Sequence, residues 1–268
     1  MMNEGKRNLL GVLVDAVDYE YVVSRTIEAA RKGTALGVSA LAVHGVMTGV
    51  GNSVQRYRLN RLEIVTPDGQ PVRWLMNILY GTRLRDRVYG PRLTAEILRA
   101  AAAEGLPVFL YGSSKQINEA LRNRLEKLLP ALTIAGAEPS AFRTLEAAER
   151  EALLGRIRES GARLVFIGLG CPKQEVFVYE NREALSMPVL AVGAAFDYLA
   201  GVLREPPETV QRLGLQWLYR LFQQPKRLAK RYLILNAKFT VMAAAQWCGI
   251  WRPDPLTTNA PSEMISHG

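Results

Sequence analysis

The residue of this sequence that is best placed to act as a general base is Asp68, in the segment Thr66-Pro67-Asp68-Gly69. It follows Leu62 to Val65, an apolar run with the length and composition of a buried strand. A carboxylate at the end of a strand could take a proton from a hydroxyl group within hydrogen-bond reach. An aspartate before a glycine is also typical of a tight turn, where it bonds its own backbone. For Asp68 considered alone, the turn is the stronger interpretation.

A second polar site is predicted where another apolar run, Leu164 to Ile167, meets a glycine loop that ends at Gly170. Pro172 favours the first turn of a helix, so Gln174 and Glu175 would lie on that turn. Parallel α/β sheets bind ligands at such strand ends, and the free N–H groups of a helix start suit a phosphate. An ordinary strand-to-helix turn explains this stretch equally well.

Two further polar loops follow expected strands. Pro107 to Tyr111 leads into Gly112 and Ser113, and Val189 to Val192 leads into a loop that reaches Asp197. Because the carboxyl ends of parallel strands meet at one edge of a sheet, these residues are candidates for contacts with a substrate. For Asp197, the capping of a helix is the simpler role.

Strand and helix patterns alternate along most of the chain. The expected strands are Leu9 to Val14, Leu62 to Val65, Pro107 to Tyr111, Leu132 to Ala135, Leu164 to Ile167 and Val189 to Val192. The expected helices are Tyr19 to Lys32, Trp74 to Tyr80, Thr94 to Ala103, Ile117 to Leu129, Ala147 to Ser160 and Val178 to Ala184. Val38 to Val46 is a further apolar run, and Met47 to Asn60 is polar and interrupted by glycines. This alternation predicts an α/β fold with a mostly parallel sheet that helices cover on both faces.

The composition of the chain changes after Gly201. Basic residues outnumber acidic ones between residues 201 and 231, and Tyr232 to Trp251 is apolar and aromatic, with Lys238 as its only charged residue. We therefore expect a core over residues 1–200, a basic and apolar helical appendage over residues 201–252, and a flexible tail over residues 253–268. Basic residues beside an apolar aromatic segment suit a membrane surface.

The net charge of the chain indicates its class of partner. A formal charge of +9 favours an anionic partner, such as a nucleic acid, a nucleotide-sugar or an anionic lipid. The sequence contains no helix-turn-helix, aromatic RNA-binding motif or zinc finger, so we expect no nucleic-acid partner. The N-terminal apolar run is too short for a signal peptide, and no stretch reaches the roughly 18 apolar residues of a spanning helix. With only two cysteines, the chain is expected to be cytoplasmic.

Metal-binding patterns are missing from the sequence. No two aspartates are two residues apart, and His44 and His267 form no ligand cluster, so we expect no metal and no other cofactor. A bound diphosphate would then be neutralised by backbone N–H groups and by arginines, of which Arg87, Arg220 and Arg227 are available. Each of these arginines is also explained as a solvated surface charge.

Six blocks of the sequence occur together, and in this order, in one known family. They are Thr66 to Gly69, Arg87 to Gly90, Gly168 to Glu175, Val192 to Asp197, Gly214 to Arg220 and Gln224 to Arg227. Through these blocks the chain resembles the WecG/TagA/CpsF glycosyltransferases, from about Leu9 to Arg231. The blocks that contain Gly-x-Pro-Lys-Gln-Glu and Gly-Leu-x-Trp-Leu-Tyr-Arg are the most specific.

The resemblance implies a Rossmann-like transferase that inverts the anomeric centre without a metal. Its donor would be a UDP-sugar, such as UDP-N-acetylmannosamine, and its acceptor would carry a polyprenyl diphosphate at the cytoplasmic face of the membrane. Such enzymes make teichoic acid linkages, capsule and other exopolysaccharides, and a basic appendage gives them peripheral membrane contact. A homo-oligomer is compatible with the resemblance. By position, the resemblance implies that Asp68 is the base. It places Arg87, Gln174 and Glu175 in the substrate pocket, and it makes Arg220 and Arg227 the arginines of the appendage.

Two positions depart from the family pattern. The Thr-x-Asn expected at the end of the second strand is Ala42-Val43-His44 here, and the aspartate usual after the Arg87 block is Arg92. His44 is either a packed histidine at a strand end or a contact that alters the choice of sugar. The missing Thr-x-Asn also keeps open an alternative function, that of a non-catalytic module that binds a nucleotide-sugar or a lipid.

Overall fold

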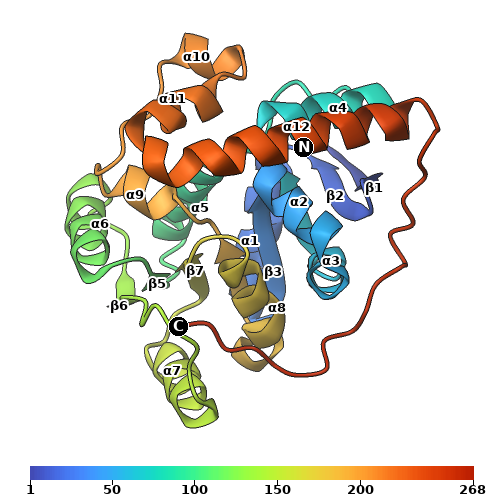
Figure 1. The fold of residues 1–268 in the computed structure, drawn as a ribbon. Helices are drawn as coiled ribbons and strands as arrows, with labels where there is room; N and C mark the ends of the chain where they lie inside the picture. The colour runs from blue at the N-terminus through green and yellow to red at the C-terminus, as the bar shows by residue number, and fades with distance from the viewer.

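The computed structural model describes the backbone of residues 1–268, together with all side chains except those of Glu208, Arg227, Lys230 and Arg231. A parallel sheet lies at the centre of the protein (Figure 1). Among the described residues its six strands follow the order β4-β3-β8-β7-β5-β6. In chain order they are β3 (Leu36–Leu41), β4 (Ile64–Pro67), β5 (Val108–Gly112), β6 (Ile134–Glu138), β7 (Leu164–Gly168) and β8 (Pro188–Ala191). All neighbouring strands pair in parallel, so the predicted Rossmann-like α/β fold is confirmed.

Helices cover both faces of this sheet. One face packs against α1 (Tyr19–Lys32), α5 (Gly90–Ala103), α6 (Lys115–Leu128) and α9 (Ala195–Leu199). The other face packs against α2 (Val43–Gly51), α3 (Ser53–Asn60), α7 (Ala147–Glu159) and α8 (Lys173–Leu185). In β7, Val165 and Ile167 belong to one apolar cluster and Leu164 and Phe166 to the other. This alternation is typical of a strand that is buried on both faces.

The N-terminal strand forms a separate hairpin, which the sequence did not predict. Strands β1 (Asn3–Leu9) and β2 (Val12–Val17) pair antiparallel. They are joined by Leu10 and Gly11, whose φ angles are 57° and 92°. The prediction of one strand over Leu9 to Val14 was wrong because Leu10 is buried in the turn and so continues the apolar run. The Leu10 N–H donates to Gln246 Oε1 at 2.9 Å, which secures the turn against the C-terminal helix.

The apolar run Val38 to Val46 contains the end of β3 and the start of a helix. The strand ends at Leu41, Ala42 precedes α2, and His44 lies in the first turn of α2. We expected His44 at the end of a strand, and this prediction was wrong. Gly45 and Gly49 lie inside α2 and do not stop it. A Cβ on Gly45 would lie only 2.3 Å from Leu41 Cδ1, so glycine allows the helix to pack closely on that side chain.

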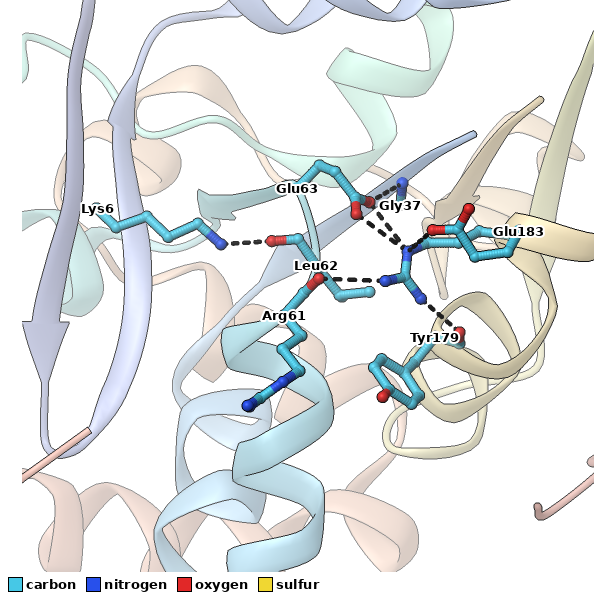
Figure 2. A network of polar contacts seen from close by, with 8 residues as sticks. Lys6, Gly37, Arg61, Leu62, Glu63, Tyr179 and Glu183 are labelled. Carbon is cyan, nitrogen blue, oxygen red and sulfur yellow. Dashed lines mark hydrogen bonds and ion pairs between the residues drawn. The ribbon is translucent and has the colours of Figure 1, made fainter. Parts of the chain in front are cut away.

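A polar network fixes the edge of the sheet at which its strands begin (Figure 2). Glu63 Oε2 accepts from the Gly37 N–H at 2.5 Å, and Glu63 Oε1 accepts from Nε of Arg182, in α8, at 3.1 Å. Lys6 Nζ donates to the carbonyl oxygen of Leu62. These bonds join β1, β3 and the loop before β4 to α8, and they lie at the opposite edge from the strand ends that carry the predicted site residues.

The C-terminal segment adds three helices to the described core: α10 (Glu208–Arg212), α11 (Gln216–Gln223) and α12 (Pro225–Trp247). Helix α12 contacts α2 and lies along α4 (Gln70–Tyr80) (Figure 1). The chain then runs back across the molecule, and the Gly268 N–H donates to the Arg143 carbonyl oxygen at 2.9 Å. The division into core, appendage and tail stays a prediction. In the described part of the chain, no helix combines the length and the apolar character needed to cross a membrane.

Candidate active site

A cavity of about 820 Å³ lies at the edge where the parallel strands end. Its lining comes from the loops after β3, β4, β5, β7 and β8, from α9, and from α11 and α12 of the C-terminal segment. Most of the predicted site residues whose side chains are described line this cavity. They are His44, Asp68, Arg87, Ser113, Gly170, Gln174, Glu175, Asp197 and Arg220.

Asp68 directly follows β4 and is half-buried at the cavity wall. Its Oδ2 accepts a hydrogen bond from the Gly90 N–H at 3.3 Å, so the carboxylate reaches across to another loop. Burial raises the pKa of Asp68, while Arg87, the Gly90 N–H and Arg220 act in the opposite direction. The bond to Gly90 differs from that of a turn aspartate, which bonds the backbone about two residues on. The position suits a proton acceptor that faces a bound substrate.

Arg87 is 5% exposed, so it is not a solvated surface charge. Its Nη1 donates to Gln216 Oε1, and its Nη2 donates to Gln211 Oε1 at 3.1 Å. Both glutamines belong to the C-terminal helices and lie more than 120 positions away in the chain. Helices α10 and α11 therefore position the arginine that stands beside Asp68.

Arg220, on α11, also lines the cavity. Its guanidinium carbon is 5.9 Å from the centre of the Tyr198 ring. Burial alone would lower the pKa of Arg220, but Tyr232, Tyr198 and other neighbours that include Asp68 raise it, so the guanidinium stays charged. The side chain of Arg227, the other arginine predicted for this segment, lies outside the described residues.

The loop after β7 is organised by Gln174. We expected free backbone N–H groups in this loop that could bind a phosphate. The Gly170 N–H instead donates to Gln174 Oε1 at 3.2 Å. Gln174 Nε2 donates to Glu175 Oε1 at 2.8 Å, and Ser39 Oγ donates to the same oxygen at 3.4 Å. Glu175 is 1% exposed, and this burial raises its pKa against the effect of its hydrogen bonds. The carboxyl group thus fixes the orientation of the Gln174 amide.

Gly112 and Ser113 bring β5 close to β7. Gly112 has φ 122°, and a Cβ there would lie 2.7 Å from the Gly168 carbonyl carbon, so only glycine fits. The Ser113 N–H then donates to the Gly168 carbonyl oxygen at 3.0 Å. Ser113 lines the cavity, whereas the contribution of Gly112 is this close approach of two strands.

Asp197 lies within α9 and lines the cavity. The N-cap of this helix is Ala194, so the capping role expected for Asp197 was wrong. Its carbonyl oxygen accepts from the Val202 N–H at 3.0 Å, at the point where the chain leaves the core.

Sequence reasoning missed several uncharged polar residues of the cavity. Of the nine buried polar side-chain atoms that lack a partner among the described residues, five belong to cavity residues. These atoms are Gln70 Oε1, Tyr89 OH, Glu175 Oε2, Tyr198 OH and Gln216 Nε2. Buried polar atoms are normally hydrogen-bonded, so their concentration here indicates a polar ligand. Tyr89 and Gln216 lie inside the Arg87 to Gly90 and Gly214 to Arg220 blocks, so these blocks were the signal that could have found them.

Within the described residues, no group of three or more His, Cys, Asp or Glu side chains is placed to hold a metal ion. Another pocket, of about 420 Å³, lies on the outer surface beside Tyr80, Trp247 and Trp251. None of the predicted site residues lines that pocket.

The fold and the cavity agree with a comparison to known protein families. The model of the Glycosyl transferase WecG/TagA/CpsF family matches residues 7–253 of this chain. The match covers the parallel sheet, all the strand-end loops of the cavity and the helices α10 to α12. The protein therefore belongs to the WecG/TagA/CpsF family of glycosyltransferases.

Proposed function

We propose that the protein is an inverting, metal-independent glycosyltransferase of cell-surface polysaccharide synthesis. It moves N-acetylmannosamine or a related sugar from a UDP-sugar to an acceptor that carries a lipid diphosphate. The observation that carries this proposal is the Asp68 carboxylate at the cavity wall, whose pKa is raised by burial and lowered by Arg87 and Arg220. A carboxylate with two guanidinium groups nearby combines a base with cationic donors for a leaving diphosphate.

The reaction proposed is a single displacement. Asp68 takes the proton of the acceptor hydroxyl, and the acceptor oxygen attacks the anomeric carbon of the donor. The bond between that carbon and the diphosphate oxygen breaks on the opposite face, so the configuration inverts. The bonding electrons leave with UDP, whose added negative charge is stabilised by Arg87 and Arg220.

The surroundings of Asp68 act on its pKa in two opposite directions. Burial makes the carboxylate a stronger base than an exposed one, because it destabilises the charged form. The two arginines and the Gly90 N–H act in the opposite direction and favour the charged form. A base is the more effective when its pKa is raised toward the working pH.

We further propose that the C-terminal segment makes peripheral contact with the cytoplasmic face of the membrane. Large apolar side chains are exposed on or beside α11 and α12: Leu213, Phe222, Leu233, Ile234, Val241, Trp247 and Ile250. The segment is also rich in arginine and lysine. Apolar side chains can enter the headgroup region, while basic ones contribute about 1 kcal/mol each beside an anionic leaflet. This contact would place the cavity next to a lipid-linked acceptor.

The proposal is tested by measuring product. The purified protein is incubated with a panel of UDP-sugars and a short-chain polyprenyl-diphosphate acceptor, and the product is identified by mass spectrometry. We expect one UDP to be released for each sugar transferred. Binding of a UDP-sugar without release of UDP would instead support the alternative of a non-catalytic binding module, which the missing Thr-x-Asn suggests.

A further inference from the structure

Two tyrosines of the cavity have no part in the mechanism given above. Tyr89 lies in the loop that carries Arg87, and Tyr198 lies on α9. They are 8% and 5% exposed, and both line the cavity. Their rings meet edge to face, with centroids 6.2 Å apart and an angle of 70° between the ring planes.

Both hydroxyl groups are buried, and neither makes a hydrogen bond of acceptable geometry with a described residue. The two hydroxyls lie close enough to interact with each other, and this contact acts to raise the pKa of Tyr89 and to lower that of Tyr198, but it does not form a regular hydrogen bond. A buried hydroxyl without a partner is costly, and a native protein usually supplies the partner. In a cavity, that partner can be a bound ligand.

The charge around the two tyrosines is positive. The guanidinium of Arg87 lies 4.5 Å from the centre of the Tyr89 ring, and that of Arg220 lies 5.9 Å from the centre of the Tyr198 ring. Arg87 is held by the neutral side-chain oxygen of Gln216, a contact that leaves its positive charge in place. Burial raises the pKa of both tyrosines, so each hydroxyl keeps its proton and acts as a donor. Two O–H donors beside two guanidinium groups match the oxygens of a phosphate.

We propose that the hydroxyls of Tyr89 and Tyr198 donate hydrogen bonds to a diphosphate oxygen of the substrate, between Arg87 and Arg220. The inference rests on the proposed function and adds two neutral donors to the two cationic ones. The diphosphate belongs either to the UDP-sugar or to the lipid acceptor. The two sources share the same chemistry, and the experiment distinguishes them.

The test uses Tyr89→Phe, Tyr198→Phe and the double variant. Each change removes a hydroxyl and keeps the ring, so the packing around it is preserved. Binding of UDP and of uridine is measured by isothermal titration calorimetry, and kcat and KM are measured with a water-soluble polyprenyl-diphosphate acceptor. Thermal unfolding of each variant serves as the check on folding.

The chain contains a matched control. Tyr57 and Tyr179 also meet edge to face, with centroids 6.1 Å apart and an angle of 78°. Arg61 lies 3.4 Å above the Tyr57 ring, and Arg182 lies 5.0 Å above the Tyr179 ring. None of these four residues lines the cavity. The variant Tyr57→Phe/Tyr179→Phe therefore removes the same groups from the same kind of cluster outside the site.

If the diphosphate of UDP is bound, each single variant should weaken UDP binding by roughly 10-fold, the worth of a hydrogen bond to a charged group. Binding of uridine, which has no phosphate, should not change. If the acceptor diphosphate is bound, the KM for the acceptor should rise instead, and UDP binding should stay the same. The control variant should match the wild type, and none of the cavity variants should unfold at a lower temperature.

Wild-type binding of UDP and a wild-type KM for the acceptor in the double variant would overturn the proposal. Equal losses for uridine and UDP would also overturn it, because they would indicate a reshaped pocket. Failure of the wild-type protein to bind either diphosphate would have the same consequence. UDP binding that depends on both hydroxyls, in a protein that transfers no sugar, would support the tyrosine pair and contradict the proposed function.

Discussion

Replacement of Asp68 by asparagine separates the function of the carboxylate from its place in the fold. The carboxamide oxygen can still accept from the Gly90 N–H, which is 3.3 Å from Oδ2, and Arg87 and Arg220 remain in the cavity. Only the proton acceptor is lost, so turnover should fall by roughly 10²–10⁴-fold, the usual contribution of a positioned base. This loss corresponds to about 3–5 kcal/mol in the activation free energy.

The same variant should not be less stable at neutral pH. The pKa of Asp68 is raised in the folded protein, so the fold disfavours the charged form. Because the folded-state pKa lies above the unfolded-state pKa, the protonated carboxyl contributes its full share to the free energy of unfolding below the unfolded-state pKa. This contribution is lost as the pH rises through the folded-state pKa. An asparagine resembles the protonated form at every pH. Asp68→Asn should therefore keep or raise the free energy of unfolding above that pKa.

The matched control is Asp254, which is a turn aspartate. Its Oδ1 accepts from the Leu256 N–H, two residues on, at 2.9 Å. Initial rates of UDP release and thermal unfolding are measured for Asp68→Asn, Asp254→Asn and the wild type. Asp254→Asn should keep full turnover. Wild-type turnover in Asp68→Asn, or a loss of activity that tracks a lower unfolding temperature, would refute the role of Asp68 as a base.

Four further predictions follow from the cavity and the C-terminal segment. Because the pKa of Glu175 is raised by burial, Glu175→Gln should raise the free energy of unfolding more at about pH 8 than at about pH 4 in urea titrations; an equal change at both would contradict the assignment. His44→Asn should change the ratio of rates among UDP-sugars several-fold without a change in thermal stability, and an unchanged ratio would leave His44 a structural role. EDTA should leave the rate of sugar transfer unchanged; a loss that manganese or magnesium restores would mean that a metal binds the diphosphate. Phe222→Ser/Leu233→Ser should reduce binding to anionic liposomes by roughly 10-fold or more while sparing turnover with a water-soluble acceptor, and Arg220→Gln should do the reverse.

The sequence alone determined the α/β class and the segments that carry polar residues at strand ends. The apolar runs at β5, β7 and β8 were short and bounded by glycine or proline, so local pattern was enough to place them. Helix α1 was predicted over Tyr19 to Lys32, as observed, because Gly33 ends it with a φ of 64°. Local signals succeed here because a helix end or a tight loop is determined by a few neighbouring residues.

Local patterns failed where a buried side chain lies in a turn or in a helix start. An apolar residue shows that a side chain is buried, but not in which backbone conformation. Leu10 therefore hid the turn between β1 and β2, and Val43 and Val46 hid the start of α2. The tertiary structure decided both cases through packing against distant segments.

The partners of the site residues were also decided by the tertiary structure. Asp68 bonds Gly90 across 22 positions, and Arg87 bonds Gln216 across 129 positions. No spacing in the sequence indicates such pairs, because they depend on the order of the parallel strands and on the path of the chain after β8. The sequence named the charged groups of the site. Only the fold brought Arg87 and Arg220 close enough to one carboxylate to lower its pKa, and buried two tyrosine hydroxyls in the same cavity, because burial and charge balance arise from contacts between segments far apart in the chain.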